Sequence, residues 1–452
     1  MNLKKLQDKS ILLFGKSRAF SMDEFGSQLK SHNIRVVNEF CEDVMVVVEG
    51  KMMTPYEQKD SEKLYERYSK ELEFISIDSF EKELAKYIDT DTLLMSLKLS
   101  HDKDRLKSFL QNSTISDELF FKLLKMYSWS KEDFFENDDN RDVSAALILR
   151  FYQNIERNHN VQYATSGLMH LIVQTNREEL IEAISELEPL QKSFDSDKKS
   201  ANYNILSSIA IHVNAPKNVL KSFIKKSDSY IKTLIAMRQN CDEDMQNILY
   251  DDMHEDVHEA LSYNFNLSKS VIDKFLEADR SVKNIAKHVK LNNELFELLI
   301  KKQHSALALN ESLTFEMQTR LHSLNKQEVM LHLAINSNLD ERLVGKLLSE
   351  DSDDIRFAVY ENPATPKENL EEAYKDEKNH LYLANNENTP SHILKALSKS
   401  LDIEVLKALA KNKSTPIEIL YQFQLDSRLA REVKENPSFG KHIQQENIGW
   451  EV

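Results

Sequence analysis

The stretch Ile355-Arg-Phe-Ala-Val-Tyr-Glu-Asn362-Pro-Ala-Thr365-Pro-Lys-Glu-Asn-Leu370 decides the fold, because its pattern recurs along the chain. Two apolar segments are joined by a turn that holds an asparagine and a threonine–proline pair. The asparagine returns every 24 or 26 residues, except around Lys290, where the spacing falls to 20. Its positions are Asn214, Asn240, Asn264, Asn310, Asn336, Asn362, Asn386, Asn412 and Asn436. A period in this range predicts a solenoid of small helical units.

The turn itself suggests how each helix ends and how the next begins. We expect Asn362 to adopt the left-handed conformation that terminates a helix. Thr365 is then expected to cap the next helix, with Pro366 as its first residue and Glu368 as its third, which is a capping box. Thr415-Pro416-Ile-Glu418 has the same form.

Apolar residues follow each asparagine at fixed distances, as in Leu343/Val344/Leu347 and Ile393/Leu394/Leu397. This spacing places them on one stripe of a helix. A small residue also recurs four positions before the asparagine, and it predicts close packing between helices. These residues are Ala210, Ala236, Ala260, Ala286, Ala306, Ala358 and Ala408. Each unit is therefore expected to bury its stripe against its neighbours.

With these features, the stretch 355–370 resembles the variant leucine-rich repeat, a relative of the HEAT and armadillo repeats. The resemblance covers 305–437 well and 210–300 more weakly. It implies units of an α-helix and a second short helix that stack into a right-handed superhelix. Some members of that family carry an iron–sulfur cluster on N-terminal cysteines. This chain lacks those cysteines, so we expect no cofactor.

Residues 1–88 are expected to form a separate α/β domain. Short apolar or β-branched runs at 10–14, 34–37, 44–48 and 74–77 predict strands, and helical spacing falls at 22–32, 61–69 and 80–88. The order β-α-β-β-α-β-α predicts a small four-stranded parallel sheet. This pattern resembles a BRCT domain, although Phe14 and Phe80 stand where many members have Ser or Thr and Trp.

The BRCT resemblance implies a phosphate site. Ser61-Glu-Lys63 matches the Ser/Thr-x-Lys motif that opens the second helix in phosphopeptide-binding members, and Lys16 and Ser17 lie in the first loop. A lysine and loop amides at a helix N-terminus suit a dianion. The alternative is that these residues are ordinary solvated surface groups. Gly15-Lys16-Ser17 is not expected to be a nucleotide loop, because Ser10 replaces the required upstream glycine.

The remaining segments complete the predicted domain organisation. Residues 89–205 have helical but irregular patterns, and we expect divergent repeats that cap the array, the first around Asn112. The regular array is assigned to 206–440 and a tail to 441–452. The fold class is thus mainly α, an α-solenoid with a small N-terminal α/β domain.

Composition narrows the function classes. A net charge of −15 argues against a protein that coats nucleic acid. Cys41 and Cys241 lack metal-ligand spacing, and the His254/His258 pair has no evident third ligand, so surface histidines are the expected interpretation. No apolar run is long enough for a signal peptide or a membrane helix, and we expect a cytoplasmic protein with no membrane partner.

These observations favour a non-catalytic adaptor whose BRCT-like head and helical array each bind protein partners. The BRCT resemblance suggests a DNA repair or replication context. The alternative is a HEAT-like DNA glycosylase or another DNA-binding repair enzyme, which requires a continuous basic groove.

Overall fold

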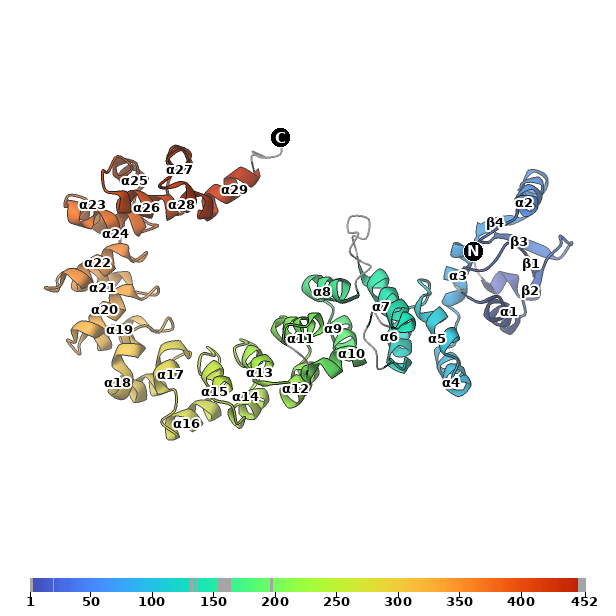
Figure 1. Ribbon diagram of the computed structural model, residues 1–452, viewed down its shortest axis with the longest axis horizontal. Helices are drawn as coiled ribbons and strands as arrows, with labels where there is room; N and C mark the ends of the chain where they lie inside the picture. The colour runs from blue at the N-terminus through green and yellow to red at the C-terminus, as the bar shows by residue number, and fades with distance from the viewer. Residues whose placement is uncertain are drawn as a thin grey trace. The chain divides into compact units, whose positions relative to one another are not determined.

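The computed structural model describes residues 3–18, 20–130, 134, 137–152, 164–195 and 198–445. It divides into two compact units, Met1–Ile235 and Ala236–Val452. A small parallel sheet comes first, and short helices follow it along the rest of the described chain (Figure 1). The predicted fold class is therefore confirmed.

The sheet of the first unit has the strand order β2-β1-β3-β4, and all of its strand pairs are parallel. The central strand β1 is buried along its whole length, as expected for a strand covered on both faces. The strands are β1 (Ser10–Phe14), β2 (Arg35–Val37), β3 (Val44–Glu49) and β4 (Glu73–Ser76).

The helices of this domain follow the predicted order but not all of the predicted bounds. They are α1 (Met22–Ser31), α2 (Pro55–Tyr68) and α3 (Ile77–Ala85). The prediction that the second helix opens at Ser61 is wrong, because a capping box of Thr54 and Glu57, with Pro55 between them, starts α2 two turns earlier. Similarly, Ser76 caps α3, which begins at Ile77, three residues ahead of the predicted start at Phe80.

The rest of the first unit consists of short helices that pack on their neighbours, such as α5 on α6 and α7, and α8 on α11. A 3₁₀ turn at Leu3–Leu6 precedes the sheet, and another at Lys192–Asp195 follows α10. The helices are α4 (Thr90–Ser100), α5 (Lys103–Leu110), α6 (Asp117–Met126), α7 (Asp138–Phe151), α8 (Ala164–Gln174), α9 (Glu178–Ser185), α10 (Glu188–Gln191), α11 (Ala201–Ile211), α12 (Lys217–Lys226) and α13 (Ser229–Ala236), the last of which reaches the division.

The second unit continues with helix pairs. We call α20, α22, α24, α26 and α28 the stacked row, because each of them packs against the next. The predicted stripes, such as Leu343/Val344/Leu347, are buried beneath it. The helices are α14 (Glu243–Tyr250), α15 (Glu255–Ser262), α16 (Lys269–Glu277), α17 (Val282–His288), α18 (Asn293–Leu307), α19 (Phe315–His322), α20 (Gln327–Ile335), α21 (Glu341–Leu348), α22 (Asp353–Glu361), α23 (Lys367–Ala373), α24 (His380–Asn385), α25 (Ser391–Leu397), α26 (Ile403–Lys411), α27 (Ile417–Gln424), α28 (Ala430–Glu435) and α29 (Pro437–Gln445), with a 3₁₀ turn at Glu377–Asn379.

The recurring asparagine does not adopt the predicted left-handed conformation. Asn362 has φ −73° and ψ 131°, and Asn336, Asn386 and Asn412 are extended in the same way. In this conformation the side chain turns inward, and Asn362 is only 4% exposed. The asparagine therefore serves a purpose other than left-handed helix termination.

That purpose is to join each repeat to the one before it. The Asn362 side-chain Nδ2 donates to the carbonyls of Ala334 at 2.7 Å and Asn336 at 2.8 Å, while its Oδ1 accepts from the Ala364 N–H at 2.8 Å. Asn386 and Asn412 each donate in turn to the carbonyl of the preceding asparagine. We call this set the asparagine ladder, and its members are Asn264, Asn310, Asn336, Asn362, Asn386, Asn412 and Asn436.

Three predicted positions of the repeat asparagine are displaced. Asn264 donates to the carbonyls of Ala236 and Arg238, so Arg238 holds the ladder position and Asn240 is exposed beyond it. Asn310 likewise donates to the Val289 carbonyl, so Val289, not Lys290, holds that position. In the repeat of Asn214, His212 holds the ladder position. Its ring accepts from the Asn214 N–H, as the ladder asparagine accepts from the N–H two residues after it.

The threonine–proline pair also differs from the prediction. The Thr389 and Thr415 hydroxyls donate at 2.7 Å to the carbonyls of Leu383 and Leu409, near the end of the preceding helix. Thr365 makes the corresponding bond to Val359. The proline, not the threonine, is the N-cap residue of the following helix, and it supplies no side-chain acceptor. The predicted capping boxes at Thr365 and Thr415 are therefore absent, because each threonine hydroxyl donates to a carbonyl of the preceding helix and does not cap the next one.

Candidate functional site

The first loop of the α/β domain is occupied by a carboxylate of the protein itself. Gly15 has φ +71°, and an added Cβ would lie 2.5 Å from the Lys51 carbonyl oxygen, so glycine is required there. The Gly15 N–H donates to Glu57 Oε1 at 3.0 Å. The pKa of Glu57 is lowered by hydrogen bonds from the backbone N–H groups of Thr54 and Gly15 and from the Thr54 hydroxyl. Glu57 thus holds an amide that an anion could otherwise use.

Three of the four residues predicted to bind phosphate have side-chain partners within the protein. Ser61 is only 2% exposed on α2, and its hydroxyl donates to Glu49 Oε1 at 2.8 Å. Lys63 forms an exposed ion pair with Asp60 at 2.8 Å.

In the loop, the Ser17 hydroxyl donates to the Phe20 carbonyl at 2.7 Å. Lys16 exchanges two backbone hydrogen bonds with Lys51, and its side chain is exposed. A phosphate site at these residues would therefore need Ser61 and Ser17 to exchange partners.

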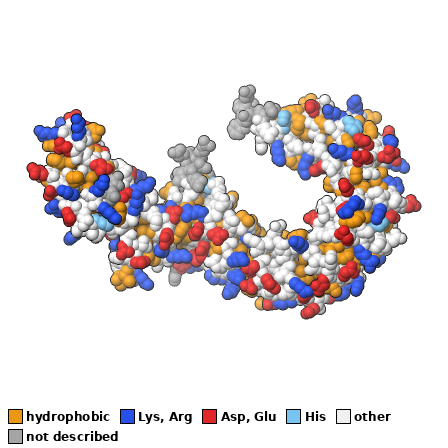
Figure 2. Space-filling model, turned by 180° about the vertical axis from the view of Figure 1, so that it is seen from behind, with side chains coloured by type: hydrophobic (Ala, Val, Ile, Leu, Met, Phe, Trp, Pro, Cys, Tyr) orange, Lys and Arg blue, Asp and Glu red, His pale blue; other side chains and the backbone are white. Residues whose placement is uncertain are grey.

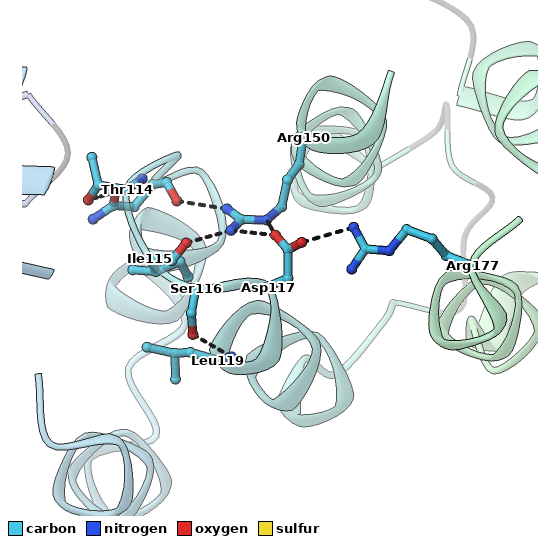
Figure 3. Close-up of polar contacts among 8 residues, drawn as sticks. Thr114, Ile115, Ser116, Asp117, Leu119, Arg150 and Arg177 are labelled. Carbon is cyan, nitrogen blue, oxygen red and sulfur yellow. Dashed lines mark hydrogen bonds and ion pairs between the residues drawn. The ribbon is translucent and has the colours of Figure 1, made fainter. Parts of the chain in front are cut away.

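A polar cluster in the first helical repeats escaped sequence reasoning. Asp117 lies between Arg150 and Arg177, which reach it from two sides (Figure 3). Arg150 Nε donates to Asp117 Oδ1 at 2.8 Å, and Arg177 Nη1 donates to Oδ2 at 2.9 Å. Partial burial acts to raise the pKa of Asp117, but the hydrogen bonds from the two arginines lower it overall. The partners lie 33 and 60 residues apart in sequence, so no local pattern signals them.

The stacked row presents a second kind of candidate surface. Phe357 on α22 and Tyr382 on α24 are half-buried and stack with ring centroids 4.3 Å apart and planes 7° apart. Leu331 on α20 and Leu381 on α24 occupy the position of Phe357 in their own repeats, five residues before the asparagine. Exposed acidic residues lie one helical turn from these side chains: Glu328, Asp354 and Glu361. We call this set the row surface.

Charges elsewhere are mixed. On the face shown in Figure 2, acidic and basic side chains are interspersed over both units. Many charged side chains of the described residues form short-range pairs, such as Lys407 with Glu404. The described residues on this face give no extended basic area.

The histidines and cysteines offer little chemistry. The interpretation of His254 and His258 as a pair of surface histidines is wrong for His258, which is 6% exposed, with its Nδ1 2.6 Å from Arg280 Nη1. His254 bonds to Asp252 instead. Burial raises the pKa of the Cys241 thiol to about 12. Among the residues that the structure describes, no group of three or more His, Cys, Asp or Glu side chains could hold a metal ion.

The described helices are also too short or too polar for a bilayer, since none of them could span one. Comparison with known proteins adds no family assignment: no family model, curated protein or solved structure matches this chain.

Proposed function

We propose that this protein is a non-catalytic protein-binding scaffold, with a BRCT-like head and variant leucine-rich repeats behind it. The observation that carries the proposal is the row surface. Its aromatic pair is half-exposed and its acidic residues are exposed, whereas Leu331 and Leu381 also pack against the core beneath them. Stacked aromatic rings that remain half-exposed are typical of side chains that anchor a partner.

The charges around the row surface define the partner. Glu328, Asp354 and Glu361 flank the apolar side chains with negative charge. A complementary segment would place an aliphatic or aromatic residue against Phe357 and Tyr382, with lysine or arginine on either side. The same carboxylates disfavour a nucleic acid backbone, so this surface supports a protein partner over the DNA-binding alternative.

Charge reversal tests the proposal. The variant E328K/D354K/E361K reverses the row surface, and E341K/E368K/E371K reverses three exposed acids on the flanking helices α21 and α23 as a matched control. Proteins captured by the full chain should be lost with the first variant and retained with the second. Equal capture by both variants would exclude the row surface as the binding site.

Two further measurements separate the remaining alternatives. A labelled DNA duplex titrated at low salt should show no saturable binding, and tight binding would instead support a DNA repair enzyme. The phosphate site at Lys16, Ser17, Ser61 and Lys63 predicts that Lys63→Ala weakens binding of a phosphorylated ligand. Unchanged binding by K63A would remove that part of the proposal.

A further inference from the structure

Asn112 has the local structure of a ladder asparagine at the start of the helical repeats. It is 1% exposed, and its Oδ1 accepts from the Thr114 N–H at 2.8 Å, as the Asn362 Oδ1 does from Ala364. Ile115, three residues on, is buried like Thr365. Asn112 is therefore the first ladder-type residue of the array.

Its amide nitrogen differs from that of the later members. In the ladder, each Nδ2 donates to two carbonyls of the preceding repeat, as Asn362 does to Ala334 and Asn336. The Asn112 Nδ2 is buried and has no hydrogen-bond partner. It therefore lacks the two carbonyl acceptors that complete the pattern elsewhere. An unpaired buried donor is destabilising, and a ligand carbonyl that accepts from it would remove that cost.

Asn112 lines a cavity of about 790 Å³ between the α/β domain and the first repeats. The charges around this cavity are unevenly compensated. Asp78 pairs with Arg18 at 2.6 Å, Asp142 with Lys107 at 3.4 Å, and Arg150 with Asp117. Glu81 is fully buried and accepts from the Arg18 N–H.

Two lysines of the lining, Lys51 and Lys82, are exposed and form no ion pair with the described residues. The charge left over at the cavity is therefore positive, and it favours an acidic ligand.

We infer that this cavity binds an extended acidic peptide segment of a partner protein. A main-chain carbonyl of the segment accepts from Asn112 Nδ2, which completes the ladder pattern, and its carboxylates face Lys51 and Lys82. This inference rests on the proposed scaffold function and gives it a second, chemically opposite site, since the row surface favours basic segments. The lining includes none of the four residues of the predicted phosphate site, although Lys51 is bonded through its backbone to Lys16.

The test uses the full chain and a short fluorescent peptide of alternating glutamate and serine with capped ends. We expect saturable binding at low salt, followed by fluorescence polarisation. The variant K51E/K82E should weaken it at least about tenfold through repulsion, while K367E/K399E, a matched pair of exposed lysines in the second unit, should leave it unchanged.

Asn112→Ala should weaken binding about five- to tenfold. Asn369→Ala, which alters a half-exposed asparagine on α23, should not. Asn112→Asp keeps the acceptor for Thr114 and removes the donor, so a folded N112D that has lost binding separates recognition from folding.

Three results would overturn the inference: no saturation by the acidic peptide, equal binding by N112A and N369A, or full competition by millimolar inorganic phosphate, which would indicate a simple anion site. None of them affects the row-surface test, because E328K/D354K/E361K leaves the cavity intact. Conversely, K51E/K82E should still capture the row-surface partners, so the two proposals can fail separately.

Discussion

Replacing Asn362 tests the ladder most directly. Its side chain makes three hydrogen bonds in a position that is 4% exposed: two to carbonyls of the preceding repeat, Ala334 and Asn336, and one from the Ala364 N–H. Asn362→Ala removes all three bonds; the Asn336 carbonyl keeps the Leu339 N–H as a donor, whereas the Ala334 carbonyl and the Ala364 N–H lose their bond to this side chain. A net value of about 1 kcal/mol for each bond gives a loss of about 3 kcal/mol at this junction.

The assay must report on one junction, because an array of this kind need not unfold in a single step. Native-state hydrogen exchange of the full chain has that resolution. A loss of about 3 kcal/mol corresponds to roughly 150-fold faster exchange in α20 and α22, provided that exchange occurs by local opening. Asn369→Ala on the neighbouring α23 is the control, and its exchange should change little or slow slightly, because alanine is the better helix former.

Glycine distinguishes the ladder from the left-handed cap that the sequence suggested. A left-handed cap favours glycine, so Asn362→Gly would then be neutral or stabilising. In the extended conformation observed, Asn362→Gly should destabilise at least as much as Asn362→Ala. Asn325→Gly is the matched control. Because the φ of Asn325 is +52° and its side chain is exposed, glycine should be neutral or stabilising there. Neutral N362G, or N362A that behaves like N369A, would refute the ladder.

Four further outcomes follow from the same contacts. Thr415→Val should cost about 1 kcal/mol, because it removes the hydroxyl bond to the Leu409 carbonyl and leaves that carbonyl only the Asn412 N–H, and exchange should rise at the end of α26. At neutral pH the Asp117→Asn variant should melt at a lower temperature than the wild type. Because folding lowers the pKa of Asp117 from 3.8, this difference in melting temperature should persist above pH 3.8 and disappear as the pH falls below it. The helices around Val289, which has no side-chain donor, should exchange faster than α22 and α24. Stepwise C-terminal truncation between repeats should lower stability gradually, and an all-or-none collapse would contradict nearest-neighbour coupling.

The elements that could be predicted are those whose signal is local. The β-branched run at Val44–Glu49 and the stripe Leu343/Val344/Leu347 have their expected places, because side-chain period alone determines which face is buried. The start of α2 was also readable. Thr54-Pro55-x-Glu57 is a capping box with proline at the first helical position, a stronger signal than the Ser61 motif.

The conformation of the asparagine could be predicted in part from the sequence. Asn362 and Asn436 precede prolines, and a residue before proline is driven out of the helical region toward extended conformations. That signal argues for the observed φ and ψ. The acceptors lie in another repeat, however, and only the stacking of repeats brings them within reach. The Asp117 cluster and the unpaired Asn112 amide depend on tertiary contacts in the same way.

Three repeats have a residue other than asparagine at the ladder position, and these residues show which hydrogen-bonding groups the position uses. Two donors are needed to bridge carbonyls two residues apart, and one acceptor is needed to hold the turn that follows. Asparagine supplies all three groups on a short side chain, whereas aspartate has no donor and serine has one. His212 retains the acceptor, Arg238 can only donate, and Val289 can do neither.

At Val289 a main-chain bond substitutes for the side chain, since the Lys290 N–H donates to the Phe265 carbonyl at 2.9 Å. The ladder is therefore a cumulative restraint that individual repeats can partly forgo. Because the ladder and the row surface occupy different positions of the repeat, changes at Phe357 or Glu361 need not disturb the junction at Asn362. A repeat built in this way can vary its exposed face while its buried turn stays the same, which is the property that a binding scaffold requires.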